Sequence, residues 1–555
     1  MNILCLALYD ALWGQCRNQA LLLKVLKENK NTSIFYYPCG TFIKDYCNAM
    51  ANRFIQISDP INKKQEVCLE CCSNSRLVVE TLEIKSFTLA NENKYKQGRS
   101  LSKLNISRWA MFEAIILSKN LSSRLCKIGK AIYTAIKINS ENLNDAYKVA
   151  LHNTEPAIAI TQHTAYSYNR VFNEMCKKRS IPCYSLNSSL NFAHPSTKAL
   201  IFRDAPIDFY NSSIKDWPVY RNISVNEEEA NLCKDHLISL MEGKGFAYSK
   251  KIVARKAPNH VRQKKHVVIF LSSYDELLAS KYSGFMPNKE NHVFNTQIDW
   301  VRWIYDYAKK KNQWKFTIRP HPREFTSYTE NSLSQHALKL IEIFKDRPTN
   351  VEINLPDQNI SAYDLLFDCD LVLFSWSSVG LEASMLGIPA ITYFPEALLH
   401  PNRIVKVCQS RKEMQLSIER CLKTGRNIQR SINAFRWANY LFNATTVDLA
   451  EKNNLRNKIS LWLTKKLPIN KRTKRKLEIF LTMTGNNEKK LIKDLFERKE
   501  RSLQRGYYAT RLKASSRSEK TNIINCLKEI YNRYAEMSEN KNSKYSVFIN
   551  SLATN

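Results

Sequence analysis

The order of apolar and polar positions along the chain predicts alternating strands and helices. Residues 2–8 and 33–37 are short apolar runs, and the amphipathic stretch 18–29 lies between them. A strand, a helix and a second strand in this order are typical of a parallel sheet. The same pattern returns at 156–186. We therefore expect residues 1–225 to form one α/β domain.

A second α/β pattern occupies residues 265–450. Apolar runs at 266–271, 315–319 and 371–374 predict buried strands separated by helical stretches. Between the two patterns lies 226–264, an acidic helical stretch followed by a basic segment with a proline. Two such blocks joined by a linker predict two Rossmann-like, doubly wound domains that face a cleft.

Residues 451–555 differ in character and predict a basic helical extension. They hold 25 Lys and Arg against 10 Asp and Glu. Apolar residues spaced along one helical side would suit an anionic membrane surface: Leu491, Ile492, Leu495, Phe496 and Leu503. The alternative is a tail that packs back on the domains.

Composition narrows the class of protein and of partner. The 555 residues are 44% hydrophobic and carry a formal net charge of +33, which indicates a folded chain with an anionic partner. Fifteen cysteines without a secretion signal or an apolar stretch long enough to cross a membrane favour a cytoplasmic location. No zinc-finger, RNA-recognition or KH pattern is present, so we do not expect nucleic acid.

Hydroxyl groups follow the strand predicted at 371–374. In "FSWSSVGLEASMLGIPAI", Ser375, Ser377 and Ser378 come between this strand and a short helix, and Glu382 lies one turn further on. Ligands of open α/β sheets bind at the carboxyl ends of strands, and a helix start suits a phosphate. Glu382 would accept hydrogen bonds from ribose hydroxyls. The alternative is that Ser378 only caps the helix and Glu382 faces water.

Two other predicted strand ends carry groups that suit phosphate. In "TIRPHPRE", Arg319, His321 and Arg323 alternate with two prolines that stiffen the loop. Arginine and histidine in such a loop would neutralise a diphosphate. In "FLSSYDE", Ser272 and Ser273 end the strand that begins at His266. Three strand ends of one domain therefore predict a common phosphate-binding site, and the alternative for each is an ordinary polar loop.

The "RPHP" strand end followed about fifty residues later by "SSVGLEASMLGIPAI" resembles the donor-binding half of GT-B glycosyltransferases. The resemblance covers about 265–410 and is greatest to enzymes of bacterial capsule and lipopolysaccharide biosynthesis, including Kdo transferases and sialyltransferases. It implies that His321 contacts the nucleotide phosphate. It also implies that Ser377 and Ser378 bind this phosphate or the sugar carboxylate, and that Glu382 lies near the ribose.

The resemblance leaves the catalytic base open, because the sialyltransferase (D/E)(D/E)G motif has no match here. A base for an inverting transfer is expected in the first domain, across the cleft. Asp10 and His163 each follow a predicted strand there. We prefer His163, with helix capping or acceptor positioning as its alternative roles.

Cysteines gather in the first domain. Cys39, Cys47, Cys68 and Cys71 have spacings compatible with a tetrahedral Zn²⁺, and Cys72 is adjacent. A structural zinc site is one interpretation, and buried free thiols are the other. No cofactor is expected at the donor site, because basic side chains and the helix start would stabilise the phosphate.

These patterns predict a GT-B glycosyltransferase at the inner face of the cytoplasmic membrane. It would transfer a sugar, with a CMP-linked acidic sugar favoured by the resemblance, to a surface-polysaccharide acceptor carried on a lipid. A CDP-polyol phosphotransferase and a sugar-nucleotide 2-epimerase are the alternatives among enzymes. A basic scaffold that binds polyanions is the alternative of another class.

Overall fold

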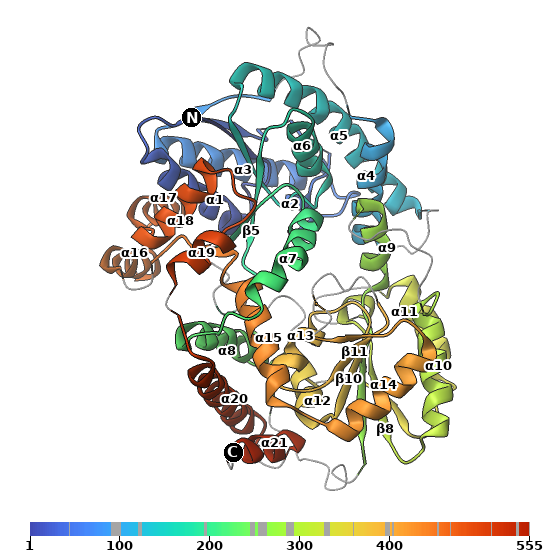
Figure 1. Ribbon diagram of the computed structural model, residues 1–555. Coiled ribbons are helices and arrows are strands. Elements are labelled where there is room, and N and C mark those ends of the chain that lie inside the picture. Colours follow the sequence, from blue (N-terminus) through green and yellow to red (C-terminus); the bar gives the residue numbers. More distant parts are fainter. Residues whose placement is uncertain are drawn as a thin grey trace.

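The computed structural model has two lobes (Figure 1). It describes the chain except for residues 41, 44, 90–100, 120–124, 192, 194–196, 245–249, 254–263, 285–292, 327–332, 359, 395–399, 402–403, 452–453, 467, 512, 540–542 and 554–555. Part of the predicted linker 226–264 therefore lies outside the described residues. Each lobe is built on a sheet with helices on both faces, which confirms the two predicted Rossmann-like domains and the GT-B class of fold.

The first domain contains a seven-stranded sheet in the order β13-β6-β5-β4-β1-β2-β3. Its strands are β1 (Asn2–Ala7), β2 (Ser33–Pro38), β3 (Lys85–Ser86), β4 (Ile158–Gln162), β5 (Cys183–Ser188), β6 (Lys198–Arg203) and β13 (Thr446–Asp448). β5-β4-β1-β2-β3 are parallel, and Leu4 pairs with Phe35 on one side and Ala159 on the other. β6 and β13 extend this sheet in antiparallel fashion.

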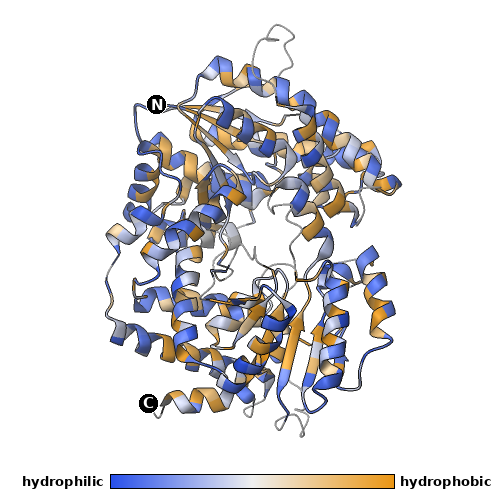
Figure 2. Ribbon diagram, turned by 45° about the vertical axis from the view of Figure 1, so that its right-hand side comes forward, coloured by the Kyte–Doolittle hydropathy of each residue, from blue (hydrophilic) through white to orange (hydrophobic). Residues whose placement is uncertain are grey.

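The second domain contains a six-stranded, entirely parallel sheet in the order β12-β11-β10-β7-β8-β9. Its strands are β7 (His266–Phe270), β8 (Lys315–Arg319), β9 (Val351–Ile353), β10 (Leu371–Phe374), β11 (Ala390–Thr392) and β12 (Lys406–Val407). All residues of β7 and β10 are buried, as expected for central parallel strands covered on both faces. The strands are accordingly hydrophobic while the outer faces of the flanking helices are hydrophilic (Figure 2).

Helices cover both sheets. Those of the first domain are α1 (Trp13–Lys27), α2 (Asn48–Ala51), α3 (Ile61–Leu82), α4 (Lys103–Ser118), α5 (Lys127–Thr154), α6 (Ser167–Lys178) and α7 (Pro206–Tyr220). Those of the second are α9 (Tyr274–Ser283), α10 (Gln297–Lys310), the 3-10 turn η1 (Pro322–Glu324), α11 (Gln335–Phe344), α12 (Ala362–Asp368), α13 (Val379–Met385), α14 (Arg411–Thr424) and α15 (Ile428–Phe442). α8 (Glu227–Met241) begins at a capping box of Asn226 and Glu229.

The C-terminal region returns to both domains. Its helices are α16 (Leu455–Lys466), α17 (Lys471–Leu481), α18 (Asn486–Glu497), α19 (Gln504–Thr510), α20 (Ser516–Ser538) and α21 (Lys544–Ala553). β13 joins the first sheet, α17 and α18 pack on α1, and α20 and α21 pack on α8 and α12 (Figure 1). Residues 446–448, which the sequence pattern places in the second domain, are thus a strand of the first, and 451–555 is shared between the domains.

The prediction that the apolar side of this helical region binds a membrane is wrong. Ile492, Leu495, Phe496 and Leu503 are buried in the core of the first domain, together with residues of β1, β5 and α1. Their apolar spacing reflects packing on the protein itself, which was the alternative interpretation of the tail. Among the described residues, no helix is both long and apolar enough to cross a membrane.

Helix α9 ties the two domains together. It follows β7 of the second sheet, yet Ala279 is fully buried in the core of the first domain, with Leu278 and Tyr282 packed beside it. α9 also contacts α4 along its length. α9 therefore contributes to the cores of both domains.

Candidate functional site

A cavity of about 230 Å³ lies at the carboxyl ends of β7, β8 and β10. Five of the predicted donor-binding residues line it: Arg319, His321, Ser377, Ser378 and Glu382. They come from two segments about fifty residues apart, and the sheet order β10-β7-β8 brings these segments to one edge. Lys250, Ser361 and Tyr363 complete its polar lining. We call this space the β8–β10 cavity.

His321 is held by its own loop. It precedes η1, and its Nδ1 accepts a hydrogen bond from the Arg323 backbone N–H at 3.3 Å. An Nδ1 that accepts leaves the ring proton on Nε2, so Nε2 of the neutral ring is a donor. Pro320 and Pro322 line the cavity on either side and restrict the backbone around this histidine. The ring is thereby suited to donate to an anionic oxygen.

Arg319 supplies a buried positive charge at the end of β8. It is 4% exposed, and its Nη1 donates to the Asn354 side chain and, at 2.9 Å, to the Ile360 carbonyl. Both of these acceptors are neutral groups. A buried cation at the cavity wall attracts an anionic ligand strongly, because water screens it little.

Glu382 forms a hydrogen-bonded group with two neighbours. Its Oε1 accepts from Ser378 Oγ at 2.8 Å and its Oε2 from Tyr363 Oη at 2.7 Å. Burial raises the pKa of the Glu382 carboxyl, and the two hydrogen bonds partly oppose this rise. Ser378 therefore does not cap α13, as the alternative interpretation had it, but orients the glutamate. The carboxylate keeps lone pairs for hydroxyl groups of a ligand.

The start of α13 lies unusually close to β10. A Cβ on Gly380 would come within 2.3 Å of the Phe374 ring. Glycine at this position lets the helix approach the strand, which places Ser377 and Ser378 at the cavity. Ser377 Oγ accepts from the Val379 backbone N–H at 3.3 Å, and its carbonyl accepts from His400 Nε2 at 3.0 Å.

Three predicted donor-binding serines do not line the cavity. Ser272 Oγ accepts from the Trp376 backbone N–H at 2.8 Å and donates to the Trp376 carbonyl, so it joins the ends of β7 and β10. Ser273 Oγ donates to Asp275. Ser375 is 1% exposed and its Oγ lies 3.3 Å from Tyr393 Oη. These hydroxyls therefore make contacts within the protein, next to the cavity.

Arg323 also points away from the cavity. Its guanidinium donates to Asp275 Oδ2 from Nε and Nη2, both at 3.2 Å, and to the Ile116 carbonyl on α4. Arg323, which was predicted to bind a phosphate, therefore joins the His321 loop to α9 and to the first domain.

A larger cleft of about 710 Å³ opens between the domains. Its wall in the first domain includes Tyr9, His163 and Asn187, which follow or end β1, β4 and β5. The second domain contributes Glu276, Ser280 and Trp376. Trp376 lines the cleft and the next residue, Ser377, lines the β8–β10 cavity, so this step of the chain borders both spaces.

His163 occupies a strained turn at the wall of this cleft. Its φ of 40° lies in the left-handed region, which is uncommon for a non-glycine residue. The ring packs edge-on against Tyr166, and Nε2 is buried without a hydrogen-bond partner in the described part of the chain. Burial lowers the pKa of His163 to about 4, against the opposing effect of a hydrogen bond with Asn187. The imidazole is therefore neutral at physiological pH.

Asp10, the other predicted base, lies in the core. It is fully buried and lines neither space, and its Oδ2 accepts from Tyr36 Oη at 2.6 Å and Ser75 Oγ at 2.5 Å. Burial raises its pKa to about 6. This placement favours a structural role in joining β1, β2 and α3.

The predicted zinc ligands do not form a metal-binding group. Within the described ranges, no three or more His, Cys, Asp or Glu side chains lie together as a metal site would require. Burial raises the pKa values of the Cys39, Cys47, Cys68 and Cys71 thiols, that of Cys47 to about 12. Cys71 Sγ accepts from the Ala11 backbone N–H at 3.1 Å. These contacts are those of buried free cysteines.

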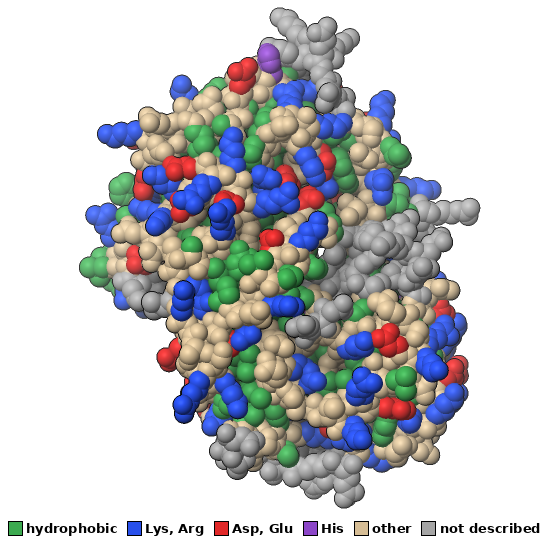
Figure 3. All heavy atoms as spheres, in the orientation of Figure 1, with side chains coloured by type: hydrophobic (Ala, Val, Ile, Leu, Met, Phe, Trp, Pro, Cys, Tyr) green, Lys and Arg blue, Asp and Glu red, His purple; other side chains and the backbone are tan. Residues whose placement is uncertain are grey.

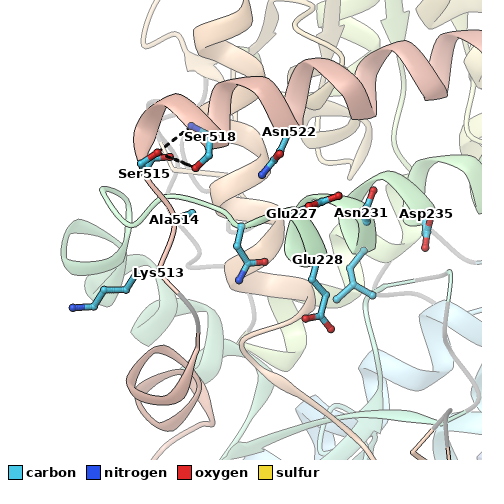
Figure 4. A pocket seen from close by; sticks show the side chains of 11 residues that line it. Glu227, Glu228, Asn231, Asp235, Lys513, Ala514, Ser515, Ser518 and Asn522 are labelled. Carbon is cyan, nitrogen blue, oxygen red and sulfur yellow. Dashed lines mark hydrogen bonds between the residues drawn. The ribbon is translucent and has the colours of Figure 1, made fainter.

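A third space, between α8 and α20, is unsuited to an anion. Its volume is about 680 Å³, and Figure 4 shows the carboxylates of Glu227, Glu228 and Asp235 on one side of it. Lys513 is its sole cation among the described lining residues, and Ser515 and Ser518 hydrogen-bond to each other. The electrostatics therefore favour the β8–β10 cavity as the phosphate site.

The sequence did not predict three polar lining residues, Lys250, Ser361 and Tyr363. The pattern places Tyr363 only in a helix, although its hydroxyl fixes Glu382. Lys250 lies in the linker and reaches the cavity wall near Pro356. A tyrosine at the start of a helix carries no local signal, whereas the basic character of the linker is consistent with an anionic ligand.

No protein-family model matches this chain, and no curated protein matches it. Among solved structures, UDP-GlcNAc 2-epimerase from Neisseria meningitidis bound to UDP-GlcNAc is similar over 80% of this chain and 97% of its own, with 12% identity and a TM-score of 0.29. KpsC, a β-Kdo 2,4 transferase from Thermosulfurimonas dismutans, is similar over 43% and 68%, with 11% identity and a TM-score of 0.27. MurG from Acinetobacter baumannii is similar over 80% and 97%, with 9% identity and a TM-score of 0.27. At such low TM-scores these similarities carry no conclusion about activity.

Proposed function

We propose that the protein is a glycosyltransferase that takes a sugar from a nucleotide donor. The observation that carries the proposal is a pair of spaces bordered by the adjacent residues Trp376 and Ser377. One is the β8–β10 cavity, which is lined by Arg319, His321 and Glu382. The other is the larger cleft, which is lined by the neutral His163. A transferase needs such a pair, because donor and acceptor must be bound side by side.

The β8–β10 cavity fits the phosphate and ribose of the donor. Arg319 and His321 Nε2 would balance the phosphate charge, and the hydroxyls of Ser377 and Ser378 add polar contacts. Glu382, with lone pairs left over from Tyr363 and Ser378, would accept from ribose hydroxyls. The cavity is too small for a whole nucleotide sugar, so the sugar would extend past Trp376 into the cleft.

The proposed reaction is a single inverting displacement. The acceptor hydroxyl transfers its proton to the imidazole of His163 while its oxygen forms a bond to the anomeric carbon. The bond between that carbon and the phosphate oxygen breaks, and its electron pair stays on the leaving phosphate. Arg319 and His321 would stabilise the developing charge there. A neutral imidazole is the protonation state that a general base requires.

The cleft suits a glycan acceptor. Several aromatic side chains line it, and aromatic faces with polar edges bind sugar rings well: Tyr9, Phe112, Tyr166, Phe202, Phe209 and Tyr210. We propose a surface-polysaccharide acceptor carried on a lipid. The donor we favour is a CMP-linked acidic sugar, because the HP and SS segments resemble enzymes that use such donors.

Binding and turnover assays test the proposal and separate its rivals. Titration calorimetry with CMP, CDP, UDP and GDP should show selective binding of one nucleotide. CMP binding supports the favoured donor, and CDP binding points to a polyol phosphotransferase. UDP binding with conversion of UDP-GlcNAc in the absence of acceptor would indicate a 2-epimerase. Binding of every polyanion with strong salt dependence and no nucleotide preference would favour the scaffold.

A further inference from the structure

Helix α16 presents large apolar side chains at the surface of the protein. Leu455, Ile459 and Trp462 follow one another at helical spacing and are 70%, 43% and 57% exposed. On the inner side, Ser460 and Thr464 are buried, and Thr464 Oγ1 donates to the Ser460 carbonyl at 2.8 Å. A helix on a water-facing surface normally buries its apolar side chains, so this exposed stripe calls for another occupant.

The arrangement contrasts with that of α18 nearby in the sequence. There Ile492, Leu495 and Phe496 face the first domain and are buried. The chain thus turns the apolar side of α18 inward and leaves Leu455, Ile459 and Trp462 of α16 at the surface. α16 lies at the outer edge of the first domain (Figure 1).

Positive charge surrounds the stripe. Arg456, Lys458 and Lys466 on α16 are exposed, and so is Lys476 on α17. The sequence has no acidic residue from 454 to 477. Three further cations of α17 are already paired with carboxylates of α3: Lys471 and Arg475 with Glu70, and Arg472 with Glu80.

The second helix adds to the same edge. Asn457 on α16 exchanges hydrogen bonds with the Met483 backbone, which brings the end of α17 to the start of α16. Phe480, in the last turn of α17, is 65% exposed. At the left edge of Figure 3, hydrophobic side chains reach the surface over α16 next to Lys and Arg side chains.

We propose that the exposed face of α16, with the end of α17, docks onto an anionic lipid surface. Tryptophan and aliphatic side chains would enter the boundary between headgroups and acyl chains, and the flanking cations would pair with lipid phosphates. The exposed apolar side chains and the surrounding cations together indicate which kind of surface covers this face. A second copy of this basic chain would bring like charges together, whereas an anionic bilayer satisfies apolar and charged groups at once.

Vesicle co-sedimentation of the full chain tests the proposal. The probes are vesicles of phosphatidylcholine alone and of phosphatidylcholine mixed with phosphatidylglycerol. We expect binding to the anionic vesicles only. The double variant Ile459→Ser/Trp462→Ser should bind them about tenfold more weakly or worse, because two side chains no longer enter the apolar layer. Arg456→Gln/Lys458→Gln should reduce binding and its salt dependence.

Matched controls keep the outcome interpretable. Val547 on α21 is 72% exposed and lies outside the proposed surface, so Val547→Ser should bind vesicles like the unchanged chain. The substituted side chains lie at the surface, and circular dichroism should show unchanged folding. Absence of vesicle binding, or binding equal in the Ile459/Trp462 variant, would overturn the proposal. So would a dimer in sedimentation velocity that this variant dissolves, because a second copy would then cover the face.

Discussion

His163 is the residue on which the proposed chemistry depends most. Its placement combines a strained backbone, burial and a ring nitrogen without a partner among the described residues. Strain of this kind is retained where the surrounding structure enforces it, most often at functional sites.

The pH profile of turnover should reflect the lowered pKa of His163. A base must be unprotonated, and a pKa of about 4 keeps the imidazole neutral at any higher pH. The acidic limb of kcat/KM should therefore fall near pH 4. His163→Gln should lower kcat by about 10²- to 10⁴-fold with nucleotide affinity unchanged. His152→Gln, an exposed histidine of α5, is the control. An acidic limb near the ordinary histidine pKa, or full activity of His163→Gln, would contradict this role.

Single residues of the site were predictable where a strand end is marked by the sequence. His321, Ser377 and Ser378 lie at the cavity as predicted, because the apolar runs before them locate the ends of β8 and β10. Ser375 and Arg323 do not, because neighbouring side chains at a strand end point to opposite sides. Which side each takes depends on α9 and β11, which local sequence does not reveal.

At the scale of elements, the contact between β10 and α13 shapes the cavity. Gly380→Ala would place a Cβ against the Phe374 ring, and α13 would have to move outward. We expect a loss of about 1–3 kcal/mol in the free energy of unfolding, as in overpacked cores, and weaker nucleotide binding. Urea denaturation and calorimetry measure the two effects.

Gly14→Ala is the control for this substitution. Gly14 lies in α1, and no atom outside its own helix turn lies within 4 Å of the position that a Cβ would take there. Alanine should therefore be neutral or stabilising at this position. Equal stability of the two variants would mean that the Phe374 contact does not constrain α13.

Elements were predicted well where their apolar period was clear. β1, β2, β7 and β8 lie within a few residues of their expected places. The strand β13 was not expected, because three residues at the end of a helix-rich stretch carry no period. Its place is decided by pairing with β6.

At the scale of the whole molecule, the C-terminal helices join the domains through buried ion pairs. Glu519 of α20 is 1% exposed and accepts from Arg436 of α15 at 2.8 and 2.6 Å and from the Val225 backbone N–H at 2.8 Å. Composition alone indicated a basic tail, but it could not show that acidic residues of this tail are partners of arginines elsewhere.

Loss of this pair should destabilise the protein. Glu519→Gln leaves the Arg436 guanidinium without a compensating charge, at a cost of about 3 kcal/mol, and should lower the urea midpoint. The exposed pair of Glu342 and Lys345 on and beside α11 provides the control. Glu342→Gln should cost less than about 1 kcal/mol. Equal midpoints for both variants would show that the C-terminal helices do not hold the domains together in this way.

The measurement that most directly tests the central claim is a calorimetric titration of the favoured nucleotide into the unchanged chain and into His321→Ala. The account predicts selective binding that weakens about 10- to 100-fold in the variant, because a hydrogen bond to a charged phosphate is lost, and that is unchanged in His152→Ala. Absence of nucleotide binding, or equal affinity in all three proteins, would contradict the proposed donor site.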